Sequence, residues 1–194
     1  VYHLNRLGSS MYGMRYLEHG VFRMKPKKPF FGSKKDDNFT IGSFGFLSPN
    51  KNIQQIIDIA AEAGVAFRAN YASTNTDYAN ELRRYADERN VSMALTTNFL
   101  DEQEILDLLA NVDVCTSFQD SIVHSATSGS SRFLLNLGLP ILCSPGQQFS
   151  DLGSAALRVT RDSAVEVLRE LRTNRDFYQH NVREVGRFVT QNSM

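Results

Sequence analysis

From residue 39 onward, apolar positions along the chain follow two alternating spacings. Short runs typical of strands are separated by stretches in which apolar side chains recur every three or four residues, as on one face of a helix. Ile53, Ile56, Ile57 and Ala60 show the helical spacing, and Gly64 then favours a helix end. The pattern predicts six strands, at residues 39–46, 65–71, 91–97, 112–115, 141–143 and 156–159.

The helices between and after these strands carry boundary signals of their own. Asp101 followed by Glu104 is typical of a capping box, and Gly138 is placed to end a short helix over residues 132–137. Two more helices are expected at residues 163–172 and 175–191. The apolar positions expected to mark the longer helices are Tyr78, Leu82, Tyr85, Ile105, Leu108, Leu109, Val165, Leu168, Leu171, Phe177, Val182, Val185 and Val189.

Strands separated by helices of ten or more residues predict a parallel sheet with right-handed crossovers. We therefore expect an α/β fold, with a Rossmann-like parallel sheet of about six strands and helices on both faces. In such a sheet ligands bind outside the carboxyl ends of the strands. The loops expected at those ends are residues 45–51, 71–75, 98–100, 116–131 and 144–153.

The first 38 residues differ from the rest of the chain. They contain Pro26, Pro29 and Gly32, and residues 23–35 hold six basic side chains and no acidic one. This basic stretch favours a solvated linker, with binding of a phosphate or of anionic lipid headgroups as the alternative. Because the sequence begins at Val1 without an initiator Met, we expect a piece of a longer protein whose lead-in segment occupies residues 1–38.

Charge and cysteine content narrow the function classes. The 21 Lys and Arg balance the 21 Asp and Glu, so the chain lacks the basic footprint of a dedicated nucleic-acid binder. Cys115 and Cys143 lie in apolar runs, which predicts buried thiols in a reducing compartment and a cytoplasmic location. The sequence shows no apolar run long enough for a membrane span and no His, Cys and carboxylate spacing that predicts a metal site.

Two loops contain residues suited to an anion. Residues 128–131, Ser-Gly-Ser-Ser, come immediately before a helix, where free N–H groups favour a phosphate or carboxylate, although a plain N-cap gives a similar sequence. Arg132 is expected either to add a forked donor to a phosphate or to be a surface cation. Lys51 stands at the start of a helix, an unfavourable place for a cation unless an anion lies nearby.

The long loop after the fourth strand supplies other candidates. His124 and Ser125 are candidate catalytic residues there, although a lone loop histidine is more often incidental. Asp120 and Asp151 are the loop carboxylates expected to face the cleft. The glycines at positions 42 and 45 lack the spacing of a dinucleotide-binding fingerprint, and no Walker A motif is present.

Four segments together resemble the C-terminal, nucleotide-sugar-binding half of a GT-B glycosyltransferase, most closely the family 4 (group 1) retaining enzymes. They are residues 42–52 (GSFGFLSPNKN), 98–105 (NFLDEQEI), 112–114 (VDV) and 137–142 (LGLPIL), and the resemblance spans residues 39 to about 172. It implies that the loop from Gly45 to Lys51 binds the donor diphosphate, with Lys51 at the lysine position and Phe46 where an arginine is expected. It also places Asn98, Phe99 and Leu100 against the donor base.

The chain departs from the family at its paired glutamates. Phe133 stands at the position that the resemblance assigns to the ribose glutamate, and Ser125 at the position of the sugar glutamate. The resemblance then leaves diphosphate and ribose to the hydroxyls and amides of residues 125–131, so that Ser128, Gly129, Ser130, Ser131 and Arg132 are expected donor contacts.

The resemblance also has implications for the whole protein. It implies transfer of a sugar from a nucleotide-sugar to an acceptor in glycan or polysaccharide biosynthesis, without a metal or another cofactor. Residues 39–172 would form the donor-binding domain, residues 1–38 a hinge, and residues 173–194 a helix packed on that domain. The acceptor would be bound by an N-terminal domain that this chain lacks, so we expect no turnover by the chain alone, and peripheral membrane association is a further possibility for the full-length protein.

Two alternatives stay open. The absence of both glutamates favours a glycosyltransferase-like interaction or regulatory module that has lost catalysis. The second alternative is a nucleotide-sugar epimerase of similar architecture or an unrelated nucleotide-binding fold. An epimerase would require carboxylates for proton abstraction, and these loops supply few.

Overall fold

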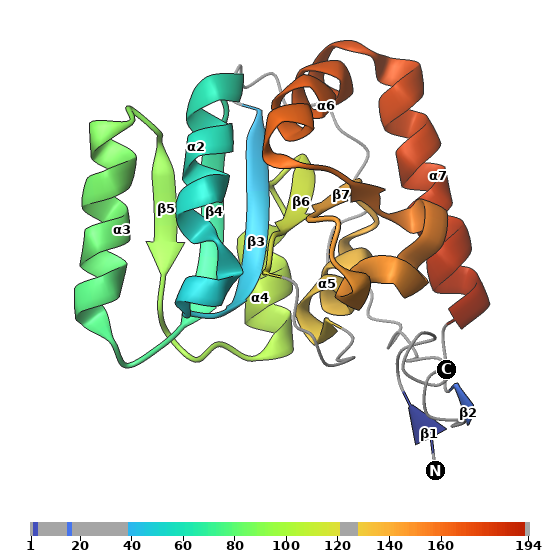
Figure 1. The fold of residues 1–194 in the computed structure, drawn as a ribbon, viewed down its shortest axis with the longest axis horizontal. Coiled ribbons are helices and arrows are strands. Elements are labelled where there is room, and N and C mark those ends of the chain that lie inside the picture. Colours follow the sequence, from blue (N-terminus) through green and yellow to red (C-terminus); the bar gives the residue numbers. More distant parts are fainter. Residues whose placement is uncertain (1, 4–14, 17–38, 121–127, 193–194) are drawn as a thin grey trace.

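The computed structural model describes residues 2–3, 15–16, 39–120 and 128–192. Its main feature is a six-stranded sheet in the order β5-β4-β3-β6-β7-β8, in which every neighbouring pair is parallel (Figure 1). The short strands β1 and β2 pair with each other apart from it. The strands are β1 (Tyr2–His3), β2 (Arg15–Tyr16), β3 (Thr40–Phe46), β4 (Ala66–Ala72), β5 (Met93–Thr96), β6 (Val114–Ser117), β7 (Ile141–Cys143) and β8 (Leu157–Arg158).

Helices cover both faces of this sheet (Figure 1). On the front face α2 (Ile53–Ala63), α3 (Thr76–Glu88) and α6 (Arg161–Thr173) enclose one apolar core, which includes Ile57, Phe67 and Leu168. A second, rear core includes Leu109, Leu134 and Val185. Its elements are α4 (Glu102–Leu109) and α5 (Gly129–Leu134), which lie behind the sheet, then η2 (Leu135–Leu137), and η3 (Gln147–Ala155) and α7 (Arg175–Asn192), which lie at the β7 side of the molecule (Figure 1).

The predicted fold class is therefore confirmed: a Rossmann-like parallel sheet of six strands with helices on both faces. The largest shift in strand position falls on β6, which begins and ends two residues later than residues 112–115 predict. The strand β5 also begins two residues later than predicted, and β8 is one residue shorter at each end. The sequence pattern did not predict the 3-10 turns η1 (Pro49–Lys51) and η3.

The helix ends follow the local signals closely. Asp101 and Glu104 form the predicted capping box, in which Glu104 N–H donates to Asp101 at 2.8 Å and Asp101 N–H donates to Glu104 at 2.8 Å. Gly64 and Gly138 end their helices with φ of 65° and 67°, a left-handed conformation that costs glycine little. A second capping box, between Thr160 and Ser163 at the start of α6, was not predicted.

The burial of the helical apolar positions agrees with the prediction in α6 and departs from it in α7. Of the four residues expected to be buried in α7, only Val185 is fully enclosed, while Phe177, Val182 and Val189 are half-buried. The polar Asn181 is buried in their place, and its side chain donates to the Phe177 carbonyl at 2.8 Å. This helix packs at the margin of the molecule, so its apolar side chains meet the cores only along their edges (Figure 1).

Both cysteines are interior, as predicted. Cys115 and Cys143 have no exposed surface and form no disulfide. Burial raises the pKa of the Cys115 thiol to about 12, so it is protonated at neutral pH. No helix in the described part of the chain is long and apolar enough to cross a membrane.

Candidate functional site

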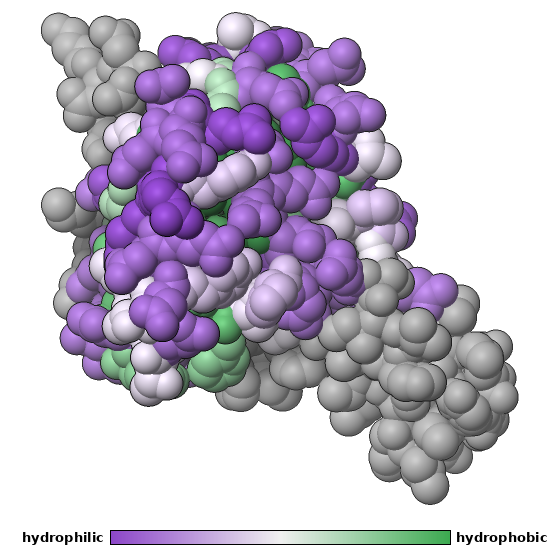
Figure 2. Space-filling model, turned by 60° about the vertical axis from the view of Figure 1, so that its left-hand side comes forward, coloured by the Kyte–Doolittle hydropathy of each residue, from purple (hydrophilic) through white to green (hydrophobic). Residues whose placement is uncertain are grey.

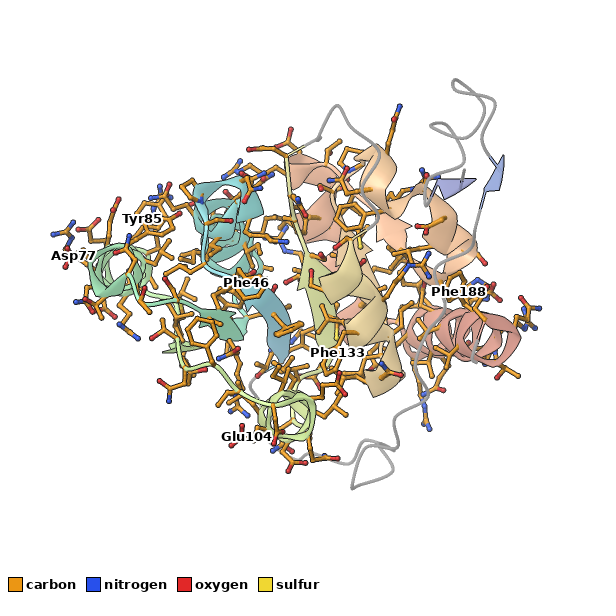
Figure 3. All side chains as sticks on the ribbon, turned by 90° about the horizontal axis from the view of Figure 1, so that it is seen from below. Phe46, Asp77, Tyr85, Glu104, Phe133 and Phe188 are labelled. Atoms are coloured by element: carbon orange, nitrogen blue, oxygen red, sulfur yellow. The ribbon has the colours of Figure 1, made fainter. Side chains whose placement is uncertain are left out.

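All six main strands run in one direction, so their carboxyl ends meet at a single edge of the sheet, which Figure 3 views from below. The loops that follow β3, β5, β6 and β7 gather at this edge. Phe46 lies near its middle, and Phe133 and Phe188 lie farther toward α5 and α7 (Figure 3). This is the edge at which the parallel fold predicts ligand binding.

The turn after β3 is fastened to the end of β6. Pro49 opens η1, and Asn52 follows in the left-handed conformation with φ of 49°, so the chain turns sharply into α2. The Asn52 side chain donates to the Asp120 carboxylate at 2.8 Å, and Asp120 N–H donates to the Asn50 carbonyl at 3.0 Å. These two bonds fix the position of Lys51 between them.

Lys51 is half-buried in this turn. Its ammonium donates to the side-chain carbonyl of Gln119 at 3.2 Å, which is its only polar partner among the described residues. A Cβ placed on Gly45 would lie 3.7 Å from Lys51 Cε, an ordinary van der Waals distance, so the lysine stem passes beside the end of β3. Burial lowers the pKa of Lys51 from its ordinary value of 10.5. An anion bound nearby would favour the charged ammonium and so raise this pKa again.

Gln119 is itself held firmly from the end of β7. Its N–H donates to Ser144 Oγ at 3.1 Å, and the Ser144 hydroxyl lies 2.8 Å from the Gln119 carbonyl. The Gln148 side-chain amide also donates to the carbonyls of Gln119 at 3.2 Å and Asp120 at 3.3 Å. A hollow of about 310 Å³ lies against these loops and the start of α6.

Two aromatic rings stand out at the same edge. Phe46 and Phe99 are 69% and 67% exposed, the only large apolar side chains so exposed among the described residues. Phe46 is the last residue of β3 and Phe99 follows β5. Because β4 lies between these two strands, their ends are two strand spacings, about 10 Å, apart. In Figure 2 the molecule is mostly hydrophilic on the face shown, with hydrophobic residues visible near the lower edge, where the strands end.

The segment after β5 is held by a hydrogen bond to β4 and by packing against the rear core. The Asn98 carbonyl accepts a bond of 3.1 Å from the buried Asn70 side chain, and Leu100 packs against the rear core. Asn98 and Phe99 themselves are exposed. The three residues predicted to lie against a nucleobase thus form an anchored loop whose first two side chains face solvent.

The serine-rich segment forms an ordinary helix cap. Ser128 Oγ accepts from Ser131 N–H at 3.4 Å, and the Ser131 hydroxyl donates back to the Ser128 carbonyl at 2.8 Å. Ser131 is fully buried, Ser130 is half-buried and Gly129 is exposed. The capping alternative is therefore present in the structure, and the donor contacts expected of this segment stay a prediction.

Arg132 and Asp151 form a buried ion pair. Their side chains are only 4% and 5% exposed, and the Arg132 guanidinium lies 5.9 Å from the centre of the Phe188 ring. The expectation that Asp151 faces the cleft is wrong, because its carboxylate turns inward to neutralise Arg132. The alternative that Arg132 is a surface cation is wrong for the same reason. Its phosphate contact stays a prediction.

The remaining candidates divide between the core and the undescribed loop. Phe133, at the position of the ribose glutamate, packs its ring 5.1 Å from that of Phe44. The candidate catalytic residues His124 and Ser125 lie outside the described residues. Within the described ranges no group of three His, Cys, Asp or Glu side chains is placed to hold a metal ion.

The sequence reasoning missed Gln119, Ser144 and Gln148. Each is a buried polar residue that follows the end of β6 or β7. Polar residues directly after buried strands were the available signal, but their partners lie 25 to 68 positions away in the chain. Only the fold brings them to Lys51.

No protein-family model matches the chain, and no curated protein matches it. Solved structures do. Anabaena HepE in complex with UDP and glucose has a TM-score of 0.68 at 16% identity over 80% of this chain and 44% of its own. The C-terminal domain of the group 1 glycosyl transferase LpcC from Francisella tularensis has a TM-score of 0.66 at 12% identity, over 79% of this chain and 85% of its own.

The chain shares their fold. Staphylococcus aureus TarM, crystallised with UDP, fondaparinux and an α-GlcNAc-glycerol, matches all of this chain with 41% of its own, at 12% identity and a TM-score of 0.68. These neighbours are GT-B glycosyltransferases, and the six-stranded sheet matches their C-terminal domains. The chain covers less than half of HepE and TarM.

Proposed function

We propose that this chain is the donor-binding domain of a glycosyltransferase that uses a nucleotide-sugar. One observation carries the proposal: the half-buried ammonium of Lys51 lies at the carboxyl edge of a Rossmann-like sheet and is held by a neutral amide. A cation in that setting favours an anionic ligand. Neighbours of the same fold bind UDP or UDP-glucose, which supports a nucleoside diphosphate as that ligand.

The proposed chemistry follows from the charge and the rings. Lys51 stabilises the negative charge that develops on the departing nucleoside diphosphate, through a contact arranged before reaction begins. Phe99 and Phe46, at the ends of two strands separated by β4, offer aromatic faces for the nucleobase, since base–aromatic stacking requires no particular base edge. In this scheme no metal or other cofactor takes part, because the protein's own cation performs the neutralisation.

The finer parts of the proposal concern the whole protein. We assign it to the family 4 retaining type, with a further GT-B domain that binds the acceptor, and place it in glycan or polysaccharide biosynthesis in the cytoplasm. Peripheral contact with a membrane belongs to the same proposal. The support is the sequence resemblance over residues 39 to about 172, together with the match to the isolated LpcC domain.

A second function, a glycosyltransferase-like module without catalysis, is favoured by one observation. Phe133 occupies the position of the expected ribose glutamate, and its ring packs against Phe44. Phe133 therefore contributes apolar packing at a position where the family has a carboxylate that contacts the ribose. Such a module would either bind a nucleotide without transferring sugar or bind no nucleotide at all.

The experiment is a melting-temperature panel of the chain with UDP, GDP, dTDP and ADP. A ligand at about 100 times its Kd stabilises the folded state by roughly 2.7 kcal/mol, which corresponds to several degrees at this size. We expect a shift with one of these diphosphates, which would also identify the donor class. No shift with any of them, and no heat of binding by calorimetry, would overturn the proposal.

A further inference from the structure

The contact between Lys51 and Gln119 has an unusual balance of charge. The lysine ammonium is half-buried, yet the group that accepts its hydrogen bond is the uncharged amide oxygen of Gln119, at 3.2 Å. No carboxylate of the described residues forms an ion pair with Lys51. The nearby Asp120 carboxylate accepts instead from Asn52. The positive charge is therefore oriented but not neutralised.

The backbone of Gln119 is fixed by other buried polar groups. Gln119, Ser144 and Gln148 are 9%, 8% and 4% exposed. Ser144 bonds both the N–H and the carbonyl of Gln119, and Gln148 donates a further bond to that carbonyl. Gln119 thus extends from a rigid point, and its side chain sets where the flexible lysine ends.

We propose that Gln119 is a positioning residue, which holds the Lys51 ammonium toward the donor diphosphate while leaving its charge available. This inference rests on the proposed function. It explains the choice of residue, because a glutamate has nearly the same shape as glutamine but would neutralise the ammonium and repel a phosphate. Alanine at position 119 would remove the hydrogen bond to Lys51 and leave the positive charge of Lys51 intact.

The experiment compares Gln119→Glu, Gln119→Ala and a matched control, Gln54→Glu. Gln54 is exposed on α2, three residues from Lys51, so its variant adds the same charge without the contact. We expect Gln119→Glu to weaken UDP binding by about tenfold or more, the loss of one charge-assisted contact, and Gln119→Ala by about threefold. Gln54→Glu should change the Kd by less than about twofold.

Stability distinguishes positioning from a structural role. The new ion pair should leave the melting temperature of Gln119→Glu equal to or above that of the unaltered protein, although its UDP affinity falls. In a Lys51→Met background, Gln119→Ala should no longer change the Kd, because the group that it positions is gone. An equal loss in both backgrounds would overturn the proposal.

A nitrogen-15 NMR titration of the Lys51 side chain tests the contact without any nucleotide. We expect the Lys51 pKa to rise in Gln119→Glu and to stay nearly constant in Gln54→Glu, because only the first places a carboxylate at the ammonium. An unchanged Lys51 pKa in Gln119→Glu would overturn the inference. Failure of the unaltered protein to bind UDP, GDP, dTDP or ADP would instead overturn the proposed function.

Discussion

Two cations near the carboxyl edge of the sheet are held in opposite ways. Arg132 is 4% exposed and is bonded to the equally enclosed carboxylate of Asp151. Lys51 is half-buried and is bonded to the neutral amide of Gln119. The first charge is cancelled inside the protein, whereas the second has no counter-charge among the described residues.

The difference follows from the cost of burying charge. A fully enclosed guanidinium without a counter-charge would cost several kcal/mol, so Arg132 requires Asp151. A partly exposed ammonium keeps some of its hydration, and one neutral acceptor is enough to hold it. The partner of each basic residue is therefore the reason to expect a structural role for Arg132 and, under the proposed function, a binding role for Lys51.

The largest predicted effect comes from breaking the buried pair. Arg132→Met leaves Asp151 as an unpaired carboxylate with a side chain only 5% exposed. We expect a loss of about 3–5 kcal/mol in the free energy of unfolding. At this size that corresponds to a fall of roughly 6 °C or more in melting temperature, measured by differential scanning calorimetry.

A surface pair provides the control for this variant. Arg161 and Glu62 also form an ion pair, but their side chains are 42% and 47% exposed. Arg161→Met should cost less than about 1 kcal/mol. The double variant Arg132→Met/Asp151→Leu should recover much of the lost stability, because it removes the stranded charge. A similar loss in all three variants would contradict the contrast between buried and exposed pairs.

The next effect concerns the cation that is left available. Lys51→Ala should weaken nucleoside diphosphate binding by about 1–3 kcal/mol, the range for a charge-assisted contact, as measured by isothermal titration calorimetry. Its effect on unfolding should be much smaller than that of Arg132→Met, since no buried counter-charge is stranded. Unchanged affinity would remove Lys51 from the site.

Two variants sharpen this test. Lys51→Arg keeps a positive charge and should retain more affinity than Lys51→Ala, although its planar group cannot repeat the contact of an ammonium with Gln119. Arg84→Ala removes a cation that is 73% exposed on α3, away from the sheet edge. It should leave the affinity unaltered. Equal losses in Arg84→Ala and Lys51→Ala would indicate a general effect of net charge.

The fold was predictable because its signals are local. The spacing of Ile53, Ile56 and Ile57, the end at Gly64 and the capping box at Asp101 each depend on residues within one or two turns. The departures occur where distant packing decides. Asn181 is buried in α7 in place of three predicted apolar residues because the cores reach that helix only at their edges.

The site was predictable only in part, for the same reason. The position of Lys51 at the edge follows from the order of strands and loops, whereas its partner Gln119 stands 68 residues later in the sequence. The inward turn of Asp151 likewise depends on Arg132, 19 residues earlier and in another element. Charge and spacing identified candidates, but pairing across the fold decided which of them stay available.

A smaller expected effect is that of salt, which should weaken UDP binding at Lys51 more than it weakens the buried ion pair of Arg132. Raising ionic strength from about 0.05 M to 0.5 M shortens the Debye length severalfold and screens the half-exposed Lys51 more than the buried Arg132. We expect UDP affinity to fall severalfold across this range. The melting-temperature difference between the unaltered protein and Arg132→Met should stay nearly constant. The contrast would fail if salt reduced that difference as strongly as it reduced affinity.

The smallest predicted effect is on the pH dependence of stability. Burial lowers the pKa of Lys51 in the folded protein below its ordinary 10.5, so between those two values the unfolded chain binds more protons than the folded one. Stability therefore rises with pH in that window relative to Lys51→Met, in which the other titrating groups are the same. Paired melting curves from neutral pH up to about 10.5 measure the difference. A bound diphosphate favours the charged lysine, so saturation with UDP should flatten or reverse this rise in stability with pH. Without ligand, a fall in stability with pH relative to Lys51→Met would contradict the lowered pKa.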